Sequence, residues 1–288
     1  MTINQLSFSG LVVSILAILA GAIVRATGSG DGCGASWPTC NGEIIPNFDT
    51  SSELIEFSHR FISGFLLIIT LIIFIKSFKD KVPNLHKKII WLLTFFVLLE
   101  ALIGAVIVVY EWVGLNSSSP RIIAVPLHLL NTFGLLGTYT LLFHLTKNSK
   151  NSLNNFFDKG FKISLCLFLL SGATGSIAAL ADVIFPSESF IVGLTEDFDR
   201  NSEVLTRLRI LHPIVATGLS IYLYSEANRL QEEYKIFTKN IKALILLGVV
   251  LGVLNVVSNI ILPLSILHLL MADLLWVVYV HKSAEKIR

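Results

Sequence analysis

Long apolar runs recur along the whole chain, and they constrain its fold more than any other feature. A helix that crosses a lipid bilayer needs about 20 predominantly apolar residues. Segments of this kind occupy residues 8–26, 56–76, 89–110, 122–145, 161–183, 207–225, 241–262 and 264–281. The connections between them are too short for a separate soluble domain. We therefore expect an all-α integral membrane protein with eight transmembrane helices.

Composition and charge agree with this class and predict an orientation. Of the 288 residues, 53% are hydrophobic and only 15% are charged, outside the usual range of soluble domains. No basic residue precedes the first apolar run, so we interpret it as the first helix and not as a cleaved signal peptide. Most basic residues fall on one side of the predicted membrane: Lys76, Lys79, Lys81, Lys87, Lys88, Lys147, Lys150, Lys159, Lys162, Arg229, Lys235, Lys239, Lys242, Lys282, Lys286 and Arg288. The positive-inside rule then places this side, with both termini, in the cytoplasm of a cell membrane.

The longest loop predicted on the outer side, residues 27–52, is rich in glycine and contains Cys33 and Cys40. Outside the cytoplasm, two thiols seven residues apart are expected to oxidise to a disulfide. Such a pair either fixes the loop or exchanges electrons with a partner, and the sequence leaves both roles open. The third cysteine, Cys166, lies within the fifth predicted helix, where we expect a small apolar filler.

The second half of the chain echoes the first in register and in order. The matched pairs are His59…Gly64 with His212…Gly218, Pro126…His128 with Pro263…His268, Gly21-Ala22 with Gly172-Ala173, and Leu99…Gly104 with Leu247…Gly252. Four spans preserve chain direction, so such repeats are related by an axis along the membrane normal. We expect two four-helix bundles, residues 1–147 and residues 148–288.

Four of the seven histidines fall at one predicted depth, one in each even-numbered helix: His59, His128, His212 and His268. Each lies a few residues into a helix that starts at the outer side, which corresponds to roughly 6–10 Å below the outer surface. The other three, His86, His144 and His281, fall at the inner side, where solvated or interfacial imidazoles are ordinary.

Histidine pairs on facing helices of a bundle commonly hold a haem iron from both sides, with apolar walls around the porphyrin. A lone intramembrane histidine is more often a packing residue, but four at matched depth favour ligands. We predict that His59 pairs with His128 and that His212 pairs with His268, each pair binding one haem.

The basic residues of the outer side are all arginines, including Arg25, Arg60, Arg121, Arg207 and Arg209. Arginine grips carboxylates with two parallel hydrogen bonds, so these side chains are candidates to bind haem propionates. The alternative is pairing with lipid phosphates or with the acidic loop at residues 196–203.

The two halves differ three residues before the first histidine of each. Glu56 precedes His59, whereas Arg209 precedes His212. A carboxylate beside a haem can move protons during chemistry, whereas an arginine there would hold a cofactor. This difference predicts Glu56 as a catalytic residue in the first half and electron transfer in the second.

The motifs resemble those of the haem A synthase family. The resemblance rests on residues 21–40 (GAIVRATGSGDGCGASWPTC), on Glu56-Phe57-Ser58-His59-Arg60 and on the three further histidine-bearing helices, so it covers essentially the whole chain. It implies an eight-helix membrane oxidoreductase of haem A biosynthesis and cytochrome oxidase assembly. Such enzymes oxidise the C8 methyl group of haem O to a formyl group by successive hydroxylations, with water as the oxygen source.

By this resemblance, His59 and His128 would face the substrate haem, Glu56 would assist catalysis, and His212 and His268 would ligate a haem b cofactor. Cys33 and Cys40 would match the outer-loop pair. A haem O synthase upstream and the lipid bilayer are the implied partners, no nucleic acid is expected, and a homo-oligomer is left open. Some relatives carry a second cysteine pair after helix 5, whereas residues 185–206 have none and are acidic.

Two other function classes stay open at this point. A two-haem b-type cytochrome would share the four histidines, although Glu56 and the cysteine loop weigh against it. A haem carrier or transporter would need a polar path across the membrane, and the polar residues within the apolar runs are few: Glu100, Asp182, Asn255 and Asp273. These are more typical of hydrogen bonds between helices.

Overall fold

The computed structural model describes residues 1–150, 152–229 and 235–285. Two of the basic residues assigned to the inner side, Lys286 and Arg288, lie outside the described residues, as does the side chain of Lys235. The long helices are α1 (Ile3–Ala26), α2 (Ser51–Lys79), α3 (Asn84–Val109), α4 (Ser119–Lys147), α5 (Lys159–Ile184), α8 (Leu211–Arg229), α9 (Lys235–Val257) and α10 (Leu262–Glu285). The short ones are η1 (Ser29–Asp31), α6 (Phe190–Phe198), α7 (Val204–Arg207) and η2 (Leu208–Ile210).

The predicted fold class is confirmed. Within the described residues, 8 helices are long and apolar enough to cross a membrane, and each contains most or all of one predicted span. The predicted end of the seventh span, at residue 262, is wrong. Helix α9 stops at Val257 because Asn259 and Ile260 adopt left-handed backbone conformations, with φ of 57° and 58°, which no α-helix continues through.

Side chains at several helix starts explain where the helices begin. Thr2 accepts a hydrogen bond from the backbone N–H of Gln5, whose side chain in turn accepts from the N–H of Thr2. Thr50 caps α2 and Asp158 caps α5 in the same manner, each accepting from a backbone N–H three residues on. These contacts satisfy backbone donors that the first turn of a helix leaves without a partner.

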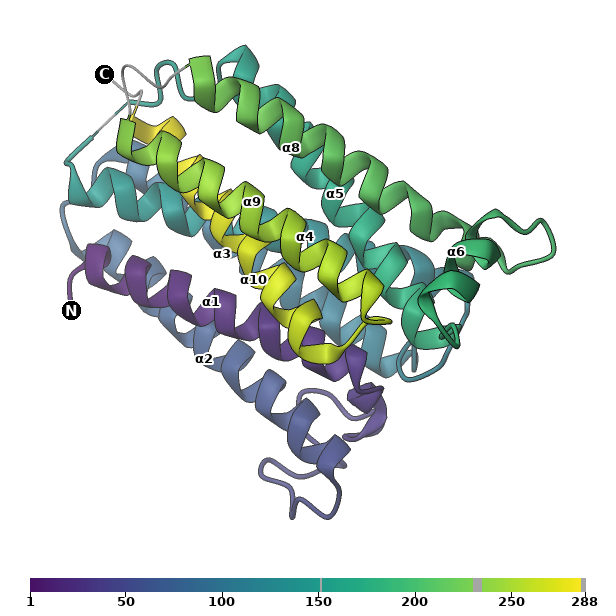
Figure 1. Cartoon of the computed structure of the whole chain (residues 1–288). Helices are drawn as coiled ribbons and strands as arrows, with labels where there is room; N and C mark the ends of the chain where they lie inside the picture. The colour runs from purple at the N-terminus through teal and green to yellow at the C-terminus, as the bar shows by residue number, and fades with distance from the viewer. Residues whose placement is uncertain (151, 230–234, 286–288) are drawn as a thin grey trace.

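Helix α4 lies at the centre of the assembly. It packs against α1, α3, α5 and α10, and 50% of its most apolar window is buried, against 11–33% in the other spans. Helices α1 and α2 pack together, as do α2 and α3, α5 and α8, α8 and α9, and α9 and α10. The start of α1 and the end of α10 lie at one end of the helices, whereas α6 lies at the opposite end (Figure 1). We call these the terminal end and the loop end.

The contact between α4 and α10 joins the two halves of the chain. The indole N–H of Trp276 on α10 donates to the backbone carbonyl of Phe133 on α4 at 2.9 Å, and the two rings pack edge to face with centroids 5.8 Å apart. Phe168 of α5 packs on both rings. This aromatic group buries the polar N–H of a tryptophan with its partner in place, as a membrane interior requires.

Three side chains nearer the terminal end differ from their predicted surroundings. His86 and His144 are buried and not solvated: His86 Nε2 lies 2.7 Å from the Lys150 carbonyl, and His144 packs edge to face on His281 with centroids 4.9 Å apart. Cys166, predicted as a small apolar filler within the helix, is exposed on the surface of α5. Helix rotation decides such exposure, and the apolar sequence around these residues does not fix that rotation.

Candidate functional site

Each of the four predicted ligand histidines lies against a glycine of the preceding long helix. A Cβ atom built on Gly21, Gly175 or Gly252 would lie 2.9 Å from the Cε1 atom of His59, His212 or His268, respectively. At Gly104 the corresponding distance to His128 is 3.6 Å, an ordinary contact. The four rings therefore rest on α1, α3, α5 and α9 at places where a larger residue would push three of them away.

The Nδ1 atoms of two of these rings face backbone carbonyls one turn before the glycine. His59 Nδ1 lies 3.1 Å from the carbonyl oxygen of Ala17, and His268 Nδ1 lies 2.9 Å from that of Gly248. A carbonyl can only accept, so each Nδ1 carries the proton and each Nε2 is left as a free ligand atom. Partners of this kind orient metal-bound histidines in proteins.

The other two histidines differ from this arrangement. The backbone of Ser171, one turn before Gly175, lies beside the ring of His212. The Nδ1 atom of His212 nevertheless meets no partner with hydrogen-bond geometry in the described part of the chain. His128 Nδ1 lies 3.2 Å from a carboxylate oxygen of Glu100, the residue one turn before Gly104, but this contact also lacks hydrogen-bond geometry. One of the four histidines therefore faces an acidic side chain and not a peptide group.

The rings of His212 and His268 lie close to each other. Their centroids are 6.1 Å apart and their planes are inclined by 81°. Two metal–imidazole bonds of about 2 Å, with the size of the rings added, give a separation of about 6 Å between imidazoles that share one metal ion. This pair has the spacing of two axial ligands. His59 and His128, which we predicted to form the first pair, lie within electrostatic range of each other.

The candidate iron ligands in the described residues are pairs of histidines, and no larger group of ligands is found there. Within residues 1–150, 152–229 and 235–285, no group of three or more His, Cys, Asp or Glu side chains comes together as a metal site. Two ligands suffice when a porphyrin supplies the remaining ligands of the iron.

Glu56 is buried near the start of α2, with both carboxylate oxygens engaged. One oxygen accepts the backbone N–H of Cys33 at 2.8 Å, and the other forms an ion pair with Arg60. Arg60 also donates to the carbonyls of Ser36 and Thr39, both at 2.6 Å. The residue predicted to be catalytic therefore also ties the cysteine loop to the helix that carries His59.

The predicted disulfide between Cys33 and Cys40 is present, and both cysteines are buried. Glu53, one turn before Glu56, accepts from the Asn41 side chain at 2.9 Å and from the Asp49 backbone at 2.8 Å. Two carboxylates of α2 thus hold the loop against the helix.

Three of the five predicted propionate-binding arginines have a buried donor without a partner. The Nε atoms of Arg25, Arg121 and Arg207 meet no hydrogen-bond acceptor in the described part of the chain. Arg25 lies within electrostatic range of Arg121. Buried guanidinium donors that lack acceptors are expected where an anionic group binds, since leaving them unpaired is costly. Haem propionates are anionic groups of this kind.

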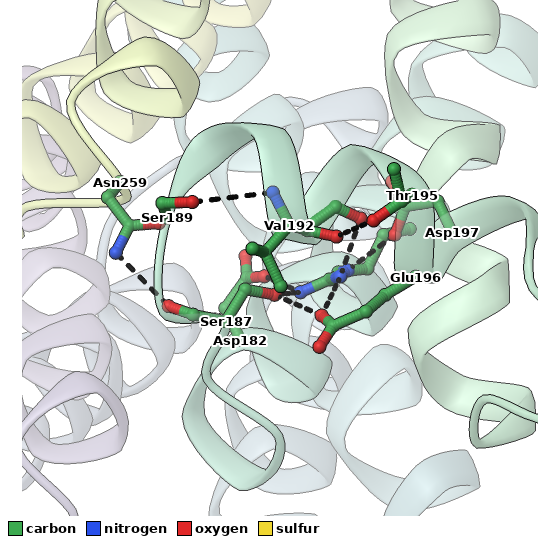
Figure 2. A network of polar contacts seen from close by, with 10 residues as sticks. Asp182, Ser187, Ser189, Val192, Thr195, Glu196, Asp197 and Asn259 are labelled. Atoms are coloured by element: carbon green, nitrogen blue, oxygen red, sulfur yellow. Dashed lines mark hydrogen bonds and ion pairs between the residues drawn. The ribbon is translucent and has the colours of Figure 1, made fainter.

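The other two arginines hold protein carboxylates. Arg60 pairs with Glu56, as described above, and Arg209 contacts Asp182 at 3.1 Å and Asp197 at 2.8 Å, with Glu196 at 3.5 Å. For Arg209 this is the alternative named with the prediction, pairing with the acidic loop. Figure 2 shows Asp182, Glu196 and Asp197 as sticks within this network of polar contacts. The network fastens α6 to α5 and to η2.

Sequence reasoning missed two contributions to the site. Glu100 stood only as a polar residue within a span, although its spacing of four residues before Gly104 was a signal that could have placed it beside His128. The glycines that contact the four histidine rings were predicted only as part of the internal repeat, and no contact with histidine was assigned to them. That repeat aligned Gly21 with Gly172, whereas the structure gives Gly175 the place of Gly21 and packs Gly172 against Phe133.

Comparison with known proteins shows the family of this chain. The COX15-CtaA family model, described as cytochrome oxidase assembly protein, matches residues 4–53 and 47–280. The chain belongs to this family. The predicted membership is therefore confirmed, and its eight helices make this member of the COX15-CtaA family a multi-pass membrane protein.

Curated relatives of this COX15-CtaA chain carry two different names. A protein named "Protoheme IX farnesyltransferase" from Thermus thermophilus is 34% identical over 280 residues, covering 94% of this chain and 46% of the relative. A "Heme A synthase" from Bacillus cereus and one from Bacillus anthracis are 41% identical over 97 residues, covering 33% of this chain and 31% of each relative. The chain spans less than half the length of the curated relatives it matches.

Proposed function

We propose that this chain is a haem A synthase, which oxidises the C8 methyl group of haem O to a formyl group by successive hydroxylations with water as the oxygen source. The observation that carries the proposal is the set of four histidines, each seated against a glycine, in a member of the COX15-CtaA family. Relatives named "Heme A synthase" support the choice of reaction.

In this proposal the first site, formed by α1–α4, holds the substrate haem between His59 and His128. Glu56, three residues before His59 on α2, takes up or releases protons as the methyl group loses hydrogen. Arg60 and the Cys33 N–H hold its carboxylate in one orientation. Arg25 and Arg121, whose buried Nε atoms lack acceptors among the described residues, would bind propionates.

The second site would hold haem b as a resident cofactor between His212 and His268. Their ring spacing of 6.1 Å would let both imidazoles bind one iron, and the Nε of Arg207, without an acceptor in the described ranges, would be available to a propionate. When bound, haem b supplies one-electron redox chemistry. The residues of the chain orient it: Gly175 and Gly252 let the rings approach the helices, and the Gly248 carbonyl fixes the proton of His268 on Nδ1.

The proposal includes a domain division and an orientation. Residues 1–147 would form the substrate bundle and residues 148–288 the haem b bundle, supported by the matched histidine–glycine contacts in both halves. The terminal end, which carries most lysines, would face the cytoplasm, and the loop end with both haem sites would face outward.

A haem O synthase would supply the substrate. Haem O carries a farnesyl-derived chain, and the Thermus relative named "Protoheme IX farnesyltransferase" contains a region similar to nearly all of this chain within a longer protein. This supports a close functional association of the two activities, in which product passes from one membrane enzyme to the other.

The test is the haem content of the purified protein after co-expression with a haem O synthase. Pyridine haemochrome spectra and chromatography of extracted haem should show a formyl-bearing haem that is absent when the synthase is left out. Haem b alone under both conditions would favour the two-haem cytochrome. Haem O that is bound but unchanged would favour a carrier.

A further inference from the structure

We propose that Glu100 is a positioning residue for His128, and that its carboxylate makes His128 a more strongly electron-donating axial ligand than the other three histidines. The inference rests on the proposed function, because it concerns the haem held in the first site. It deepens that proposal by assigning a role to a partly buried acidic residue of α3 that the reaction does not otherwise use.

The four histidine seats are built alike except at this position. One turn before each glycine, the chain places Ala17, Ser171 and Gly248 with peptide carbonyls near the rings. On α3 the residue at that place is Glu100, and its side chain, not its peptide group, reaches the Nδ1 atom of His128 at 3.2 Å. The looser approach of the ring to Gly104, 3.6 Å against 2.9 Å, leaves room for the carboxylate.

Hydrogen bonds of Asn131 show which oxygen of Glu100 acts as an acceptor. The Asn131 amide nitrogen donates to the other oxygen of Glu100 at 2.6 Å and to the backbone carbonyl of Phe96 at 2.8 Å. Because the Phe96 carbonyl can only accept, the amide group has its NH₂ side toward Glu100. That oxygen of Glu100 is therefore an acceptor, and Asn131 holds the carboxylate in place.

The remaining oxygen then faces the ring. When the Nε2 atom of His128 binds iron, the neutral imidazole carries its proton on Nδ1. The Nδ1 atom lies 3.2 Å from the free oxygen of Glu100, without hydrogen-bond geometry in the described part of the chain. In this inference, a reorientation of the ring on binding iron lets the N–H donate to that oxygen, and this donation favours the ionised carboxylate. A carboxylate draws the Nδ1 proton more strongly than a peptide carbonyl does, since hydrogen bonds to charged acceptors are about twice as strong as neutral ones.

The consequence is a difference between the two haem sites. Carboxylate–histidine–metal groups raise the basicity of the ligand, and hydrogen bonding around the axial ligands tunes the potential of a haem. A more basic His128 stabilises the ferric state of the haem in the first site relative to the haem in the second. Its reduction potential is therefore lowered in the half of the chain where the substrate is oxidised.

The test is the Glu100→Gln variant of the full chain, purified with both haems and titrated potentiometrically. Glutamine keeps the shape and an oxygen acceptor but removes the charge. We expect the midpoint potential of one haem to rise and the electron paramagnetic resonance signal of that ferric haem to change, with the other haem unchanged as an internal control. A parallel His212→Ala sample, which lacks the second haem, assigns the two components.

Glu100→Asp covers the case in which glutamine weakens haem retention. Aspartate keeps the charge at a slightly greater distance, so it should restore retention and bring the potential back toward that of the native protein. Unchanged potentials and spectra in Glu100→Gln would overturn the inference, as would equal haem loss in both variants, which would indicate a packing role. A first site that binds no haem in the native protein would instead contradict the proposed function.

Discussion

Gly252 lets the ring of His268 lie against the backbone of α9, with Cε1 only 2.9 Å from the position a Cβ atom would take. The prediction that follows concerns Gly252→Ala. The added methyl group must displace the ring from the Gly248 carbonyl and from His212, so we expect most of the haem b to be lost. The measurement is haem b per protein from pyridine haemochrome spectra.

Gly248→Ala is the matched control, because it lies one turn away on the same helix. A Cβ there would lie 3.9 Å from Met271, an ordinary contact, and the carbonyl that faces His268 is kept. Replacing glycine by alanine within a helix is worth about 0.5–1 kcal/mol in stability. Haem retention should therefore be unchanged; equal loss in both variants would contradict the seating of His268 on Gly252.

Glu56→Gln should separate chemistry from structure in the first site. Glutamine can still accept the Cys33 N–H but cannot move protons as a carboxylate does, so we expect conversion of haem O to fall at least about 100-fold, as for loss of a general acid–base group. Haem b should be retained. The measurement is the ratio of haem A to haem O in extracts, with haem b content from the same sample.

Arg60→Gln is the control for this variant. It breaks the same ion pair and the contacts to Ser36 and Thr39 but leaves the carboxylate of Glu56 in place. A smaller loss of conversion than in Glu56→Gln is expected. If the two variants lose conversion equally, the role of Glu56 is to hold the cysteine loop.

Removing the disulfide by the double change Cys33→Ser and Cys40→Ser should destabilise the loop end. Disulfides typically contribute about 2–4 kcal/mol, mainly by restricting the unfolded chain. We expect a lower thermal unfolding temperature and faster proteolysis within residues 27–52. Cys166→Ser, on the exposed surface of α5, should change neither, so an equal effect there would contradict this prediction.

Arg209→Ala should release α6 from the loop end. The change leaves Asp182 and Asp197 without their cation, and breaking a largely buried ion pair by removing one partner costs about 3 kcal/mol or more. Hydrogen exchange of residues 186–203 should become faster. Arg200→Ala serves as control because Arg200 is exposed, and slow exchange in both variants would show that α6 is held by other contacts.

The order of the amino acids was enough to predict the architecture. Eight apolar runs of bilayer length allow few folds other than a helical membrane protein, because a lipid interior forces each segment to satisfy its backbone hydrogen bonds internally. It also predicted the disulfide that the structure contains and marked the four histidines and Glu56 as candidate site residues, since ionisable residues in apolar runs and paired thiols in an outer loop stand out from their surroundings.

The packing of the helices set which groups these residues contact. The seat of each histidine on a glycine, the pairing of Arg209 with Asp182 and Asp197, and the approach of Glu100 to His128 depend on how the helices are rotated and shifted against one another. Uniformly apolar helices carry little sequence signal for that rotation, because lipid-facing and protein-facing positions have similar side chains. Which of these polar side chains meet is therefore visible only once the helices are packed.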